Sequence, residues 1–196
     1  FKLEGQLIKN HPEYGMDGRS FFDKVDFRRG VINIGGKEYE LRDKSFPTVD
    51  VSDPLKLSRE ESELVRILQS SFHHSGRLRQ HIKFIYDHGG MYRKINGNLL
   101  YHGCIPLNDD GSFREITLPF ADCAGKTFHG KALLDRIEQE VRSAYFNPYG
   151  TKEQKEAADF MWYLWCGADS PLYGKDKMAF FERTFLGKEA SELCTE

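Results

Sequence analysis

The sequence predicts an α+β fold, in which a small antiparallel sheet has helices before and after it. Asn96-Gly97 is a strong signal for a tight hairpin turn between two short arms. Segments on both sides of this turn repeat apolar residues at helical spacing, as Leu64, Leu68 and Phe72 do. A chain of 196 residues, of which 39% are apolar, is long enough to bury a core of this kind.

The first fifty residues predict an amphipathic segment and a β-ribbon. The chain opens with four apolar residues in helical phase, Phe1, Leu3, Leu7 and Ile8. Val31–Ile34 and Glu38–Leu41 flank the pair Gly35-Gly36, which favours a turn between antiparallel strands. Two such strands are marginal alone, so the ribbon is expected to pack against another part of the chain.

Two helices are predicted before the hairpin. Ser58 and Glu61 have the spacing of a capping box, which marks the start of the first helix. The second helix is expected from Gly76 to Gly89. Gly89 suits the left-handed backbone conformation that ends many helices.

A third strand and three more helices are predicted after the hairpin. The strand is expected at Arg114–Leu118. The helices are expected over three ranges, about Lys131 to Pro148, Lys152–Trp165 and Lys175–Leu186. Six residues of the middle helix are assigned to the core from their helical phase: Ala157, Phe160, Met161, Trp162, Leu164 and Trp165.

Composition and charge exclude several classes of protein. The formal net charge is only −2, so the general attraction of a basic protein to nucleic acid or to an anionic membrane is absent. No apolar run approaches the ~20 residues of a membrane span, and no signal peptide opens the chain. We therefore expect a soluble, cytoplasmic protein. The chain starts without an initiator methionine and stops without a turn, so we expect a fragment.

The cysteines and the clustered histidines do not predict a metal site. The four cysteines contain no Cys-x-x-Cys pair, which argues against zinc, and reduced thiols are favoured over disulfides. His73, His74 and His81 have no carboxylate pair that predictably faces them. They are expected to be solvated or to lie at an interface.

The second arm of the hairpin ends in a histidine, which makes it the most informative segment. Leu99, Leu100 and Tyr101 predict a short buried strand, and His102-Gly103 follows at its end. A histidine at a strand end fits a metal ligand, since the adjacent glycine lets backbone or ligand approach closely. The alternative is a buried histidine whose ring is satisfied by a backbone carbonyl. Spacing alone favours this alternative.

Two long runs carry a resemblance to a known family. LLYHGCIPLNDDGSF (Leu99–Phe113) and DFMWYLWCGADSPLYGKDKMAFFER (Asp159–Arg183) resemble the middle section of the class III fructose-1,6-bisphosphatases of Firmicutes. FKLEGQLI, LRDKSFPTVD and GKALLD fit the same family, so the resemblance covers essentially the whole chain. That family belongs to the calcineurin-like metallophosphatases, which place a two-metal site at the ends of two facing sheets.

The resemblance implies a function, and it favours a metal ligand over a buried structural histidine at His102. It implies that the complete enzyme removes the 1-phosphate of fructose 1,6-bisphosphate to give fructose 6-phosphate in gluconeogenesis, typically with manganese. It places His102, followed by glycine, among the metal ligands. The companion motifs, such as Gly-Asn-His-Asp and a later Gly-His, are absent from this sequence. No catalytic residue is therefore assigned, and the isolated chain is expected to be inactive and to bind no manganese by itself.

The resemblance also suggests how the chain is divided. We expect residues 1–56, with the β-ribbon, to be an insertion specific to the family. Residues 57–196 are expected to be part of the metallophosphatase core, with helices flanking the strands at residues 91–118.

The loop after the tryptophan-rich helix is a second candidate site. Lys175 and Lys177, near a helix start with free backbone amides, are candidate ligands of a substrate phosphate. The alternative is that Asp169 or Ser170 caps this helix and that the lysines are solvated. The spacing favours the alternative, because nothing in it forces these groups to converge.

The sequence is also compatible with a non-enzymatic function. The chain is either part of a metal-dependent sugar bisphosphatase or a non-catalytic regulatory or assembly module whose aromatic-rich helices form an interface. Flanking Gly-Asn-His-Asp and Gly-His motifs in the gene would discriminate between them. Surfaces exposed by a truncation are expected to cause self-association.

Overall fold

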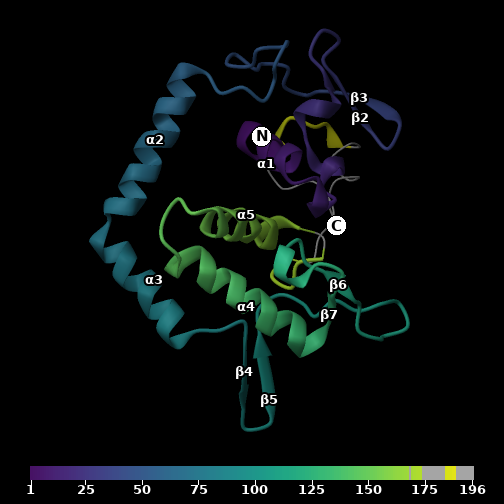
Figure 1. Ribbon diagram of the computed structural model, residues 1–196. Helices are drawn as coiled ribbons and strands as arrows, with labels where there is room; N and C mark the ends of the chain where they lie inside the picture. The colour runs from purple at the N-terminus through teal and green to yellow at the C-terminus, as the bar shows by residue number, and fades with distance from the viewer. Residues whose placement is uncertain (168, 174–183, 189–196) are drawn as a thin grey trace. The chain divides into compact units, whose positions relative to one another are not determined.

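The predicted α+β class is confirmed by a computed structural model, which describes every residue except 168, 174–183 and 189–196. The described residues form five α-helices and three small antiparallel sheets (Figure 1). They divide into two compact units, residues 1–74 with 177–196, and residues 75–176. Most of the predicted helix at Lys175–Leu186 lies outside the described residues.

The described residues of the first unit form two α-helices, α1 (Lys2–Asn10) and α2 (Arg59–His74), and one sheet. The three strands of the sheet pair in the order β1 (Val25–Asp26), β2 (Val31–Ile34) and β3 (Lys37–Glu40). Three short 3-10 helices lie between α1 and β1, at Pro12–Tyr14, Asp17–Arg19 and Phe22–Lys24. The ribbon predicted around Gly35-Gly36 is therefore confirmed.

An aromatic core holds the sheet of the first unit. Its buried residues are Phe21, Phe22, Ile32, Leu41 and Leu186. Leu41 and Leu186 form an antiparallel bridge, so a residue near the end of the chain closes the core beside the ribbon. The ribbon thus packs against another part of the chain, as a ribbon of its size requires.

The predicted capping box begins α2. Glu61 N donates to Ser58 Oγ at 3.1 Å, and Ser58 N donates to the Glu61 carboxylate at 2.7 Å. Lys2 and Thr48 donate to the same carboxylate, and these bonds lower the pKa of Glu61 to about 2. The first turn of α2 is thereby fixed to α1. No residue of α2 is buried, although its apolar residues follow the predicted helical spacing.

In the second unit, the residues that the structure describes form three α-helices, α3 (Gly76–His88), α4 (Gly130–Phe146) and α5 (Lys152–Cys166). Its two-stranded sheets are β4 (Tyr92–Ile95) with β5 (Asn98–Tyr101), and β6 (Ile116–Thr117) with β7 (Thr127–Phe128). One 3-10 helix, Ala121–Cys123, lies between β6 and β7. The third strand predicted at Arg114–Leu118 is present but is reduced to β6.

The hairpin turn between β4 and β5 is confirmed. Asn96 (φ 51°) and Gly97 (φ 79°) both have positive φ, as the predicted turn requires. Ile95 pairs with Asn98 and Arg93 with Leu100, so the two-residue loop fixes the register of the strands.

The core of the second unit lies between α4 and α5 (Figure 1). Leu133, Leu134 and Ile137 of α4 are buried, as are Ala157, Phe160 and Leu164 of α5. Each group recurs at spacings of three and four residues, which places its members on one face of a helix.

Two residues assigned to this core from the sequence are exposed. Met161 is 38% exposed and Trp165 is 77% exposed, so their assignment to the core is wrong. Each follows a buried residue, Phe160 or Leu164, and one residue turns the side-chain direction by about 100°. The buried face is therefore narrower than the run of apolar residues suggests. Trp162 is partly buried.

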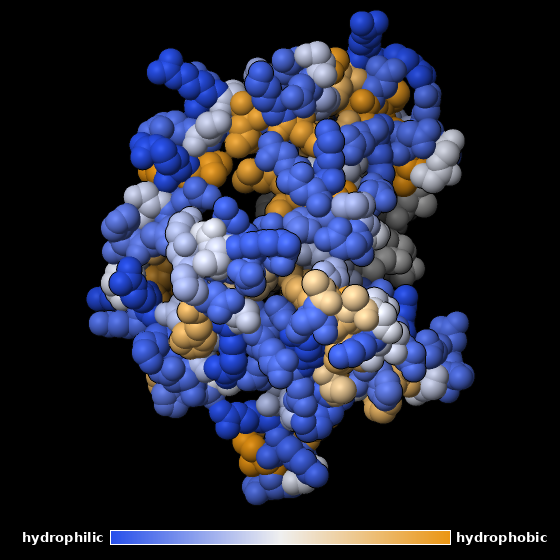
Figure 2. All heavy atoms as spheres, in the orientation of Figure 1, coloured by the Kyte–Doolittle hydropathy of each residue, from blue (hydrophilic) through white to orange (hydrophobic). Residues whose placement is uncertain are grey.

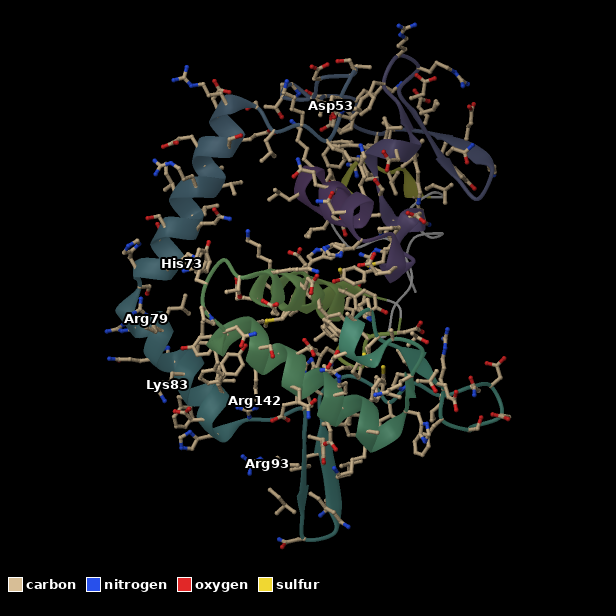
Figure 3. The ribbon with its side chains drawn as sticks, in the orientation of Figure 1. Asp53, His73, Arg79, Lys83, Arg93 and Arg142 are labelled. Atoms are coloured by element: carbon tan, nitrogen blue, oxygen red, sulfur yellow. The ribbon has the colours of Figure 1, made fainter. Side chains whose placement is uncertain are left out.

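The end of α3 differs from the prediction. Gly89 has φ −89° and ψ 179°, which is extended backbone and not the left-handed conformation expected there. Arginine side chains bind the last carbonyls instead: Arg142 donates to Tyr86 O at 2.9 Å, and Arg93 donates to His88 O. Figure 3 shows both arginines near the end of α3. Cations also complement the negative end of the helix dipole.

None of the described helices is long and apolar enough to cross a membrane.

Replacing buried Phe160 should destabilise the protein far more than replacing the exposed tryptophan. We expect Phe160→Ala to lower the free energy of unfolding by about 3–5 kcal/mol, because it leaves a cavity between α4 and α5. Trp165→Ala is the matched control and should change it by less than about 0.5 kcal/mol. Urea unfolding measures both variants. Equal losses would contradict the burial of one face of α5.

Candidate functional site

The two runs that carry the family resemblance meet in the second unit. Cys104, two residues after His102, donates its backbone N–H to Pro171 O at 2.8 Å. The Cys104 thiol, whose pKa is raised by burial, lies 3.5 Å from Ser170 O. Residues some 66 positions apart in the chain are thus hydrogen-bonded. We call residues 102–104 the His-Gly turn and residues 169–172 the Ser-Pro loop.

Gly103 makes this contact possible. Its φ is +78°, a conformation that other residues adopt at a cost. A Cβ atom on Gly103 would lie 2.3 Å from Pro171 O and 2.8 Å from Leu172 O. The backbone of the Ser-Pro loop therefore occupies the place where a side chain would be.

Ser170 fixes the Ser-Pro loop to the end of α5. Its side chain is fully buried, and its hydroxyl donates to Leu164 O at 2.5 Å. The same oxygen accepts the backbone N–H of Leu172 at 3.1 Å. One buried hydroxyl thus satisfies two backbone groups where the chain leaves the helix. The described contacts of Ser170 are those of a loop anchor.

A charged pair lies at the beginning of the Ser-Pro loop. Arg114 Nη1 is 2.9 Å from Asp169 Oδ1, and their side chains are 52% and 30% exposed. Beside this pair, burial raises the pKa of Tyr163 to about 12, and the negative charge of Asp169 adds to the rise. The ring of Tyr163 packs against Gly167, where a Cβ would lie 2.3 Å from it. The phenol is therefore neutral near pH 7.

The structure places His102 directly after β5, as the sequence predicts, but this strand is not buried. Leu99, Leu100 and Tyr101 are 48%, 53% and 45% exposed, so the predicted burial is wrong for this chain. Within its two-stranded sheet, β5 pairs with β4. Figure 2 shows apolar side chains at the surface of this hairpin.

His102 itself is exposed. The alternative that it is a buried histidine bound by a backbone carbonyl is therefore wrong. Its position at the strand end is available to a ligand, and its role as a metal ligand stays a prediction.

The described residues do not complete a metal site. They contain no group of three or more histidine, cysteine, aspartate or glutamate side chains that could hold a metal ion. Manganese requires several oxygen or imidazole donors at once, and His102 supplies one. The predicted phosphate ligands Lys175 and Lys177 lie outside the described residues. The clustered histidines His73, His74 and His81 are exposed, as expected.

Arg114 and Tyr163 are the site residues that sequence reasoning missed. Arg114 directly follows the first of the two family runs, and Tyr163 lies inside the second. Neither residue belongs to a short motif with a known chemistry. Only the contact between the two runs could have indicated them.

Comparison with known proteins finds relatives along nearly the whole chain. Relatives named "Fructose-1,6-bisphosphatase class 3" are 48% identical in Bacteroides fragilis over 97% of this chain, and 46% identical in Clostridium novyi over 98%. A protein of that name in Bacteroides thetaiotaomicron is 48% identical over 95%.

The chain belongs to the Firmicute fructose-1,6-bisphosphatase family, which it matches over residues 1–196. It spans 27–28% of the length of these relatives. No solved structure matches it.

Comparing Gly103→Ala with Gly97→Ala should separate two losses of stability, one from the steric contact of the new methyl group and one from the positive φ of the backbone. Gly97 has nearly the same φ, +79°, but a Cβ there would have no atom within 4 Å, so Gly97→Ala is the control. We expect Gly97→Ala to cost about 1–2 kcal/mol of stability. Gly103→Ala should cost about 1–3 kcal/mol more, because the Ser-Pro loop must move. Chemical unfolding of both variants checks this; equal costs would contradict the close contact.

Proposed function

We propose that the complete protein is a fructose-1,6-bisphosphatase that hydrolyses the 1-phosphate of fructose 1,6-bisphosphate to give fructose 6-phosphate. The observation that carries this proposal is the contact between the His-Gly turn and the Ser-Pro loop, which joins the two runs that carry the resemblance in a chain that matches the family over residues 1–196. The role fits gluconeogenesis in the cytoplasm, where phosphorylated sugars are used. The charge of −2 gives no support to a nucleic-acid partner.

We propose His102 as one metal ligand of the complete protein, with manganese as the metal. Support comes from its exposed position at a strand end beside Gly103. When bound, a pair of such ions would supply an activated water and neutralise phosphate charge. The described residues do not form this site, so no chemical step is derived through it. The remaining ligands would come from outside the described residues, and the isolated chain would bind no manganese.

We propose that the second unit is part of a calcineurin-like fold. The exposed apolar residues of β5 support this, because a strand of this kind is stable when it is covered or extended by further strands. Strands from the rest of the polypeptide would cover it. Within this proposal, residues 1–56 are a family-specific insertion and residues 57–196 are part of the core.

Replacing His102 tests the proposed function. In the complete polypeptide with added manganese, His102→Ala should lower phosphate release from fructose 1,6-bisphosphate by at least about 100-fold, since even groups that only orient a metal ligand are worth 10–100-fold. His81→Ala, a change at an exposed histidine of α3, is the matched control and should keep the activity.

Two results would overturn this account of the activity. Full activity of His102→Ala would exclude a metal ligand at this position. Inactivity of the unmodified complete polypeptide would favour the alternative, a non-catalytic regulatory or assembly module. The chain of residues 1–196 alone should release no phosphate.

We propose that the protein self-associates through the apolar face of α2. Four residues of this face are about half exposed or more: Leu64 at 56%, Ile67 at 48%, Leu68 at 48% and Phe72 at 65%. They share one stripe of the helix, which is the pattern of a helix that pairs with another helix.

A charge on the α2 stripe should prevent self-association. We expect sedimentation of the chain of residues 1–196 to show a dimer that Leu68→Glu converts to a monomer, because the new carboxylate would be buried without a partner. Gln69→Glu adds the same charge one residue away, outside the stripe, and should leave the dimer intact. A monomer before any substitution, or a dimer in Leu68→Glu, would refute the proposal.

A further inference from the structure

We propose that Arg114 binds the phosphate group of the substrate that is not hydrolysed. This inference rests on the proposed function, because it assumes a substrate with two phosphates. One phosphate reacts, and the other has to be recognised by groups that hold a dianion. Arginine suits this task, since its guanidinium presents five N–H donors in a planar fork that matches phosphate geometry.

Arg114 lies at the place where the two family runs meet. Its backbone N–H donates to Pro106 O at 3.1 Å, which fixes the start of this residue to the segment after the His-Gly turn. Its guanidinium reaches Asp169. Asp169 is two residues before Pro171, which accepts the N–H of Cys104, and two residues span about 7 Å at most. The guanidinium therefore pairs with the same loop that accepts the backbone N–H of the His-Gly turn.

The guanidinium is positioned but accessible. Its side chain is 52% exposed, and its ion-pair partner among the described residues is Asp169. The guanidinium has five N–H donors, and one carboxylate accepts from only part of them. The other donors can face solvent or a ligand. Asp169 is less exposed, at 30%, and belongs to a loop that the buried hydroxyl of Ser170 anchors. Arg114 is thus held by a fixed carboxylate and not by a mobile one.

The charges around Arg114 favour a phosphate as the additional partner. Asp169 carries one negative charge, and the phenol of Tyr163 beside it adds none near pH 7, as for any tyrosine at a pH well below its pKa. A phosphate monoester dianion carries more charge than one carboxylate and accepts bidentate bonds from a guanidinium. It can therefore share the guanidinium with Asp169 or displace it.

Two other arginines of the second unit, Arg136 and Arg142, are committed to the fold. Arg136 is 11% exposed and pairs with Glu140 and Asp122, and Arg142 binds Glu138 and the end of α3. Arg114 combines an exposed guanidinium with a partner in the Ser-Pro loop. This combination distinguishes it as the binding residue.

Steady-state kinetics of the complete polypeptide with manganese tests the proposal. Arg114→Ala should raise KM for fructose 1,6-bisphosphate about 10-fold or more, the loss typical of one charged hydrogen-bonded contact, with kcat changed less than about twofold. It should raise the inhibition constant of fructose 6-phosphate, which keeps the second phosphate, by a similar factor. The inhibition constant of inorganic phosphate, which resembles the transferred group, should stay the same. Arg114→Lys should recover part of the binding.

Arg29→Ala is the matched control. Arg29 is 58% exposed and pairs with Glu38 at 2.5 Å on the ribbon of the first unit, so its replacement removes a similar ion pair from residues that do not belong to the proposed site. This variant should keep all four constants.

The possible results separate the two proposals. A fall in kcat with KM unchanged, a parallel change for fructose 6-phosphate and inorganic phosphate, or no change in Arg114→Ala would overturn the role of Arg114 while leaving the enzyme assignment intact. Absence of turnover in the unmodified polypeptide would overturn the proposed function, and this inference with it. Thermal unfolding is measured for Arg114→Ala and for the unmodified protein. If both have the same midpoint temperature, a raised KM reflects weaker binding and not a folding defect.

Discussion

The site depends on one backbone hydrogen bond, from Cys104 N–H to Pro171 O. It forms because Gly103 has no side chain: any Cβ there would meet the carbonyl oxygens of Pro171 and Leu172. Each side of this contact is short, and neither run folds into a site alone. The long-range bond brings together a strand end and a helix end that are far apart in the chain. It joins the turn that contains His102 to the Ser-Pro loop, whose Asp169 pairs with Arg114.

The two sides of this contact differ in how firmly the chain supports them. The Ser-Pro loop is anchored by the fully buried Ser170 to α5, which packs on α4 around Phe160. The His-Gly turn follows β5, whose apolar side chains are exposed. The chain therefore carries a well-packed half of a site beside a half with exposed apolar surface. This agrees with a sequence that spans 27–28% of its relatives.

Much of the fold was predictable because its signals are local. The capping box at Ser58, the Asn96-Gly97 turn and the helical spacing on α4 depend on neighbouring residues, and each is confirmed. The exposure of Trp165, the extended backbone at Gly89 and the exposed β5 depend on what packs nearby, which spacing does not encode. Arg114 was missed for the same reason, because its partner Asp169 is 55 residues away in the sequence.

Hydrogen exchange at the Cys104 amide tests the central claim most directly, because this N–H makes the bond that unites the two family runs. An amide bonded to Pro171 O should exchange slowly, with protection above that of the Gly97 amide in the exposed hairpin turn. That result would support a site in which the His-Gly turn and the Ser-Pro loop are joined. Exchange at the rate of an unstructured chain would contradict it.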